Sequence, residues 1–144
     1  MKKYNLANVY HYFRATETWS VIATLPDYRR YKCIAGIVEY PDGTRGIMVS
    51  GGRNDQTSIF LNLETLEWED KAALPYDISR VSTLPYNNSI LAFGGYSNDV
   101  EGHYLDTIYF YNPEVDEWQL LSHMNTERDY FPVFYVPDSY ANCS

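Results

Sequence analysis

Two glycine pairs and three tryptophans recur along this chain of 144 residues at nearly constant distances. Gly51-Gly52 and Gly94-Gly95 each end an apolar run, and Asn and Asp follow each pair within four residues. The tryptophans lie 49 and 50 residues apart, at Trp19, Trp68 and Trp118. This self-similarity predicts a repeat array with a period of about 50 residues.

The sequence around each tryptophan repeats as well. "ETWSVIATLP" matches "LEWEDKAALP", and "DEWQLLSHMN" keeps a hydrophobic residue six positions after the tryptophan. The residue seven positions before the tryptophan is Tyr12 in the first copy, Leu61 in the middle copy and Tyr111 in the last. An arginine follows each tryptophan after 11, 12 or 10 residues, at Arg30, Arg80 and Arg128.

Within one repeat the pattern is that of β-strands. "CIAGIVEY" and "GIMVSGG" flank a Pro-Asp-Gly turn, and Asn87-Asn88 separates two further apolar runs, so both stretches predict hairpins. "TSIFLNLE" and "DTIYFYNP" alternate in character as half-buried strands do. No window keeps a helical spacing, and four short strands in about 50 residues predict an all-β chain of four-stranded propeller blades.

The glycine pairs have a structural explanation in such a blade. Residues without Cβ let the chain leave a strand with positive φ, or pass closer to neighbouring backbone than a side chain would allow. A phosphate-binding loop does not fit, because neither Lys-Ser nor Lys-Thr nor a helical pattern follows the glycines. We expect each tryptophan to cover its own sheet against the neighbouring one.

These motifs resemble kelch repeats. The resemblance rests on the glycine pairs, on the tyrosine before the tryptophan in "YFYNPEVDEW", and on the Leu-Pro and Arg that follow. Leu61 departs from the pattern, and "TSIFLNLE" lacks the usual Asp-Pro. The resemblance implies an antiparallel kelch-type β-propeller and, most often, a protein-binding module. The structural repeat positions are then Gly51, Gly52, Gly94, Gly95, Trp19, Trp68, Trp118, Tyr12 and Tyr111.

We expect a single partial propeller over residues 1–144, with about three blades of material. Residues 1–21 supply strands three and four of one blade, 32–73 and 78–122 are complete blades, and 129–136 resemble the first strand of another. Because propellers typically close with 4–8 blades, we expect either a fragment of a longer protein or a chain that needs partners to close. Open blade edges predict self-association.

Composition limits the partners. A net charge of −8 argues against nucleic acid, which is bound by basic surfaces. No apolar run reaches 18 residues, so no membrane span is expected. Cys33 and Cys143 fit either two separate thiols or a disulfide. A cytoplasmic location is favoured, and a secreted protein is the alternative.

Signs of catalysis are sparse. His11, His103 and His123 occupy different repeat positions without ligand-like spacing, and the two cysteines form no C-x-x-C motif. We therefore expect neither a metal nor another cofactor, and no enzyme. A small-molecule enzyme of the oxidase or isomerase type, on a kelch-like propeller, stays open as the alternative.

The expected function is a protein–protein interaction module of the adaptor or scaffold type. Strands alternate in direction, so the loops after strands two and four open on the same face of the propeller. The repeat arginines fit a structural role, whereas the residues that vary between repeats are better candidates for contacts. The predicted partner-binding residues are Arg29, Arg53, Asn54, Asp55, Tyr96, Asn98, His103 and Tyr104.

Overall fold

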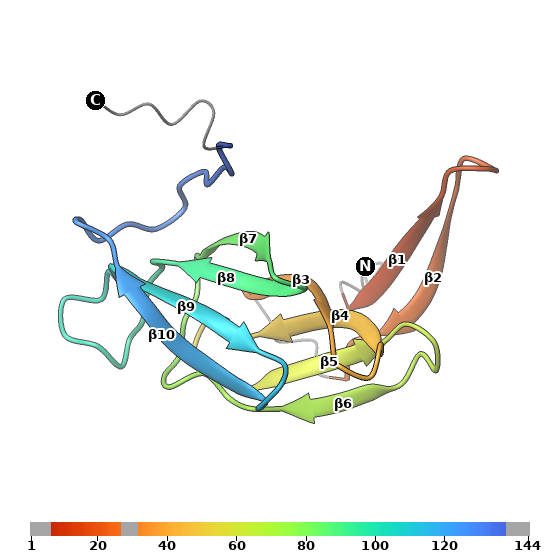
Figure 1. The fold of residues 1–144 in the computed structure, drawn as a ribbon, viewed down its shortest axis with the longest axis horizontal. Helices are drawn as coiled ribbons and strands as arrows, with labels where there is room; N and C mark the ends of the chain where they lie inside the picture. The colour runs from red at the N-terminus through yellow and green to blue at the C-terminus, as the bar shows by residue number, and fades with distance from the viewer. Residues whose placement is uncertain (1–6, 27–31, 138–144) are drawn as a thin grey trace, which may run out of the picture.

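The structure is a computed structural model that describes residues 7–26 and 32–137. The described residues form ten strands and no helix (Figure 1). The strands are β1 Asn8–Phe13, β2 Thr18–Thr24, β3 Ile34–Glu39, β4 Arg45–Ser50, β5 Ser58–Asn62, β6 Trp68–Lys71, β7 Ser82–Tyr86, β8 Ser89–Phe93, β9 Thr107–Asn112 and β10 Glu117–His123. No helix in the described ranges is long and apolar enough to cross a membrane.

All strand pairs are antiparallel, and they make three separate sheets. Strands β1 and β2 form a hairpin, β3 to β6 form the first four-stranded sheet, and β7 to β10 form the second, each in chain order. Both predicted turns are present. Gly43 turns β3 into β4 with a φ of 88°, and Asn87 and Asn88 turn β7 into β8 with φ of 46° and 58°. The prediction of an all-β chain with four-stranded antiparallel sheets is therefore confirmed.

The two glycine pairs occupy matching places in the two sheets. The first glycine of each pair donates its N–H to a carbonyl at the start of the third strand, that of Thr57 just before β5 or that of Thr107 at the first position of β9. The second glycine donates its N–H to a carbonyl in the segment after the fourth strand. All four glycines have positive φ. A Cβ on Gly51 would lie 2.5 Å from the carbonyl oxygen of Ile78, and one on Gly95 would lie 2.6 Å from that of Ser79. Conformation and close approach thus both require glycine.

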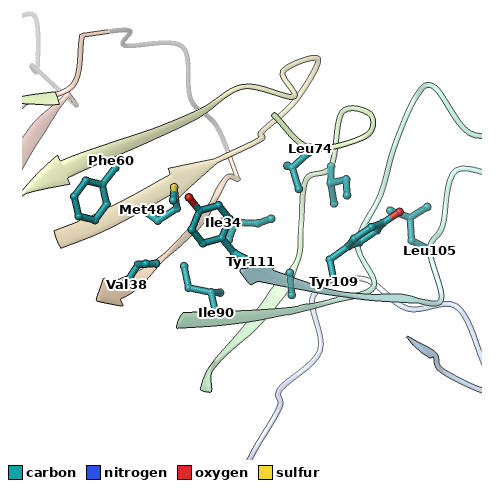
Figure 2. Close-up of a cluster of buried hydrophobic side chains, with 11 residues drawn as sticks. Ile34, Val38, Met48, Phe60, Leu74, Ile90, Leu105, Tyr109 and Tyr111 are labelled. Carbon is teal, nitrogen blue, oxygen red and sulfur yellow. The ribbon is translucent and has the colours of Figure 1, made fainter. Parts of the chain in front are cut away.

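The core lies between the first and second sheets, where β3 packs against β7 and β8. Figure 2 shows Tyr111 on β9 pointing toward Ile34 and Met48 of the first sheet, with Ile90 beside it. All four side chains are at most 1% exposed. The alternation predicted for the third strands is confirmed in β9, where Thr107, Tyr109 and Tyr111 are buried and the residues between them are less so. The same prediction is wrong for β5, where residues 58–61 are all buried because both faces of this strand are covered.

Trp68 and Trp118 each form a hydrogen bond with the sheet that precedes their own sheet in the chain. The indole Nε1 of Trp118 on β10 donates to Ser58 Oγ on β5 at 3.2 Å, and that of Trp68 on β6 donates to the Thr24 carbonyl at 2.9 Å. Trp19, on β2, is 68% exposed, and no sheet precedes its hairpin in the described residues. Trp68 and Trp118 therefore link consecutive sheets.

A polar network joins the same two sheets beside the core. The Tyr111 hydroxyl donates to Asp116 Oδ1 at 2.6 Å and lies 2.8 Å from the hydroxyl of Tyr40, which follows β3. Asp116 Oδ1 also accepts the backbone N–H of Ala72 at 3.0 Å. Burial, with these two partners, raises the pKa of Tyr111 far above its usual value, so this hydroxyl stays protonated.

Some expectations stay predictions, because they concern residues that form no strand or that lie outside the described ranges. Residues 129–136 form no strand, and their assignment to a further blade stays a prediction, as do the other blade boundaries. Cys33 is half-buried just before β3. Cys143 lies outside the described residues, so the disulfide stays open.

Candidate functional site: the loop cluster

Three connections meet at the end of the two sheets that carries the glycine pairs. They run between β4 and β5, between β6 and β7, and between β8 and β9; the last projects at the left of Figure 1. Asn98 Nδ2 donates to Asn54 Oδ1 at 2.8 Å, and the backbones of Ser79 and Tyr96 form a reciprocal pair. The name "loop cluster" is used below for residues 53–56, 77–80, 96–99, 103 and 104.

Asp77 is the centre of the loop cluster, although only 6% of it is exposed. Its Oδ1 accepts the Ser97 hydroxyl at 2.5 Å and the Asn98 backbone N–H at 3.0 Å. Its Oδ2 accepts the Asn98 side-chain amide at 3.1 Å and the Asn54 backbone N–H at 3.3 Å. Burial would raise the pKa of Asp77, but the hydrogen bonds from Ser97 and Asn98 outweigh it and hold that pKa below the usual value. An ionised carboxylate thus ties the three connections together.

A polar hollow of about 220 Å³ lies against this carboxylate. Its lining is Asn54, Gln56, Asp77, Asn98 and Asp99. Asp99 Oδ2 accepts the Asp77 backbone N–H at 3.1 Å, so this second carboxylate is also engaged within the loop cluster. Among residues 7–26 and 32–137, no three His, Cys, Asp or Glu side chains are grouped to hold a metal ion.

Tyr96 anchors the aromatic side of the loop cluster. The Arg80 guanidinium lies 4.4 Å from its ring centroid, the His103 ring stacks at 5.3 Å, and Tyr104 meets it edge-on at 5.7 Å. Arg80 also forms an ion pair with Asp129 at 3.2 Å. The hydrogen bond from this pair is the main cause that raises the pKa of Arg80. Arg80 therefore packs as a structural residue that joins two connections.

Comparison with known proteins adds the family. Residues 79–125 match the family model described as Kelch motif. The expected kelch repeat is confirmed over these residues. The matched kelch repeat contains the whole second sheet with Gly94, Gly95, Tyr111 and Trp118.

Two curated proteins of Limulus polyphemus are similar to this kelch-repeat chain over most of its length. Alpha-scruin is 24% identical over 129 residues, and beta-scruin is 25% identical over 123 residues. Each match covers 82% of this chain. The chain spans only 13% of the length of each relative.

The loop cluster brings most of the predicted partner-binding residues together. Those that are exposed on the loop cluster are Arg53, Asn54, Asn98, His103 and Tyr104. Asp55 and Tyr96 are half-buried, and the Asp55 carboxylate accepts both the N–H and the hydroxyl of Thr57 within its own turn. Arg29 lies outside the described residues. Partner contact by these residues stays a prediction.

The sequence analysis missed Asp77 and Ser97, whose hydrogen bonds fix the connections of the loop cluster. One signal could have found Asp77: it stands three residues before the repeat arginine Arg80, and Asp27 stands three residues before Arg30. A buried acidic residue at a repeated position indicates a structural hydrogen-bond acceptor.

Proposed function

We propose that this kelch-repeat chain is a protein-interaction module of the adaptor or scaffold type, and that the loop cluster contacts the partner protein. The observation that carries the proposal is the Asp77 network, which fixes exposed side chains from two connections on one rigid support. Surfaces that are ordered before binding lose less conformational entropy when the partner arrives. The kelch match and the two scruin matches support a non-enzymatic binding module.

The residue types on the loop cluster suit a protein partner. Arg53, His103 and Tyr104 are exposed around the half-buried ring of Tyr96. Tyrosine and arginine are enriched among the residues that dominate binding energy at protein interfaces. The polar hollow beside Asp77 measures about 220 Å³, smaller than the roughly 300–1,000 Å³ of typical small-molecule sites.

The test is a double substitution, Arg53→Ala with His103→Ala, in the full chain used as bait. Both side chains are exposed, so the melting temperature should stay close to that of the parent. Proteins captured from an extract by the parent should be lost. The matched control is Arg45→Ala with His11→Ala, which removes the same two side-chain types from exposed positions outside the loop cluster.

Two results contradict the proposal. One is retention of every captured protein by the Arg53/His103 variant. The other is conversion of a metabolite by the parent at a rate that the Arg53/His103 variant preserves, which would favour an enzyme instead.

A further inference from the structure

A second hollow of the loop cluster has a different charge from the first. It measures about 180 Å³, and the described residues that line it are Lys32, Arg53, Ser79, Arg80, Tyr96 and Asn98. Three of these six side chains are cationic and none is acidic, although acidic residues outnumber Lys and Arg by 19 to 11 in the whole chain. This concentration of positive charge on an acidic protein indicates a site for an anionic group. It is called the cationic hollow below.

Packing fixes two of its cations. The Arg80 guanidinium lies over the Tyr96 ring and pairs with Asp129. The backbone N–H of Arg80 donates to the backbone carbonyl of Lys32 at 3.1 Å. Lys32 Nζ lies 4.9 Å from the ring centroid of Tyr130. A ligand therefore meets charged groups that are already ordered, which lowers the entropy lost on binding.

Among the described residues, one carboxylate pairs with an arginine of the cationic hollow and another arginine has no such partner. Asp129 pairs with Arg80. Within the described ranges, no carboxylate lies at ion-pair distance from Arg53, whose side chain is exposed. The nearby Asp77 carboxylate faces Ser97, Asn98 and the Asn54 N–H instead. An incoming carboxylate would thus find an unpaired guanidinium at the rim.

We propose that the cationic hollow binds a carboxylate side chain from an acidic segment of the partner protein. The proposal rests on the proposed function and adds the chemistry of the partner. A guanidinium can hold a carboxylate through two parallel N–H donors. The volume of about 180 Å³ is that of roughly six water molecules, since one water occupies about 30 Å³ of the liquid. It therefore suits one carboxylate side chain better than a nucleotide.

The experiment titrates the isotopically labelled full chain with a short oligoglutamate peptide, capped at both ends, and follows the backbone amides by NMR. Saturable shifts are expected at Arg53, Ser79 and Asn98, and they should weaken as salt rises. The variant R53E should weaken the binding about tenfold or more, because it replaces a charge-assisted donor with a repelling carboxylate. R45E, the matched control, makes the same charge change on an exposed residue of the β3–β4 hairpin and should bind as the parent does.

Three outcomes would overturn this inference. They are equal weakening by R53E and R45E, equal binding of a capped oligoglutamine peptide, and saturation by inorganic phosphate with no response to oligoglutamate. The proposed function fails separately. If the Arg53/His103 variant loses its captured proteins while oligoglutamate does not bind, only the inference about acidic chemistry is removed.

Discussion

Asp77 is the single residue on which the loop cluster depends most. Three connections that are far apart in the sequence meet at its two carboxylate oxygens. A buried carboxylate is stable only when its hydrogen-bond acceptors are used, and here each oxygen has partners. The same network that orders the exposed Asn98 and Asn54 therefore also contributes to the stability of the chain.

The first prediction concerns the pH dependence of that contribution. The pKa of Asp77 is lowered in the folded chain from 3.8, so its ionised form stabilises the fold above that pH. This stabilisation is lost as the pH falls through the lower, folded pKa. Asp77→Asn removes this stabilisation and places an amide donor against the Asn54 and Asn98 donors. The substitution should therefore lower the unfolding free energy by about 1–3 kcal/mol at neutral pH.

Urea denaturation at a series of pH values measures this effect. The difference in unfolding free energy between the parent and Asp77→Asn should shrink as the pH falls below about 4. Asp70→Asn, which removes an exposed carboxylate on β6, is the matched control and should follow the parent at every pH. A constant difference between the parent and Asp77→Asn across the series would contradict the prediction.

At the scale of the elements, the tryptophans show that burial depends on the neighbouring sheet and not on the repeat itself. Trp118 packs against the core and bonds to Ser58 of the first sheet. Trp19 occupies the same repeat position but is 68% exposed. One sequence motif thus has two different energetic roles.

The second prediction compares these two positions. Trp118→Ala should lower the unfolding free energy by about 3–5 kcal/mol, because it removes a large ring from between two sheets. Trp19→Ala should change it by less than about 1 kcal/mol, because this ring is mainly in solvent. Thermal and urea melts of the two variants test the difference. Equal losses would mean that Trp19 is also packed against another part of the protein.

The sequence predicted the elements better than it predicted the site. Local signals such as the glycine pairs and the Asn87-Asn88 turn determine backbone conformation, so the hairpins follow from them directly. The Asp77 network instead depends on donors supplied 20 and more residues away, which no local pattern reveals. Tyr96 looked like an exposed contact residue, yet it is half-buried because Arg80 and His103 stack on it.

At the scale of the whole molecule, the strand at one edge of the array exposes apolar side chains. β10 is the outer strand of the second sheet, and Leu120 and Leu121 on it are exposed. The segment after it exposes Phe134 and Tyr135 as well. An unpaired strand edge beside exposed apolar side chains favours association with another chain.

The third prediction is that the isolated chain self-associates through this edge. Light scattering after size exclusion should give a mass above 16.8 kDa that rises with concentration. Leu121→Lys with Phe134→Lys should restore the monomer mass, because lysine on an edge strand opposes pairing. Both residues are exposed, so the melting temperature should change little. A parent chain that stays monomeric at all concentrations would refute it.

The tryptophan bonds also give the array a direction. Trp118 donates a hydrogen bond to the first sheet, and Trp68 donates one to the last residue of β2. Each four-stranded sheet is therefore supported by the unit that precedes it in the chain. Dependence of this kind is not symmetric. Damage to the first sheet removes the support of the second, whereas loss of the second sheet leaves the Trp68 brace intact. These two tryptophan contacts therefore depend on one another in one direction along the chain, from the amino-terminal units toward the carboxyl-terminal ones, although both sheets share the core between them.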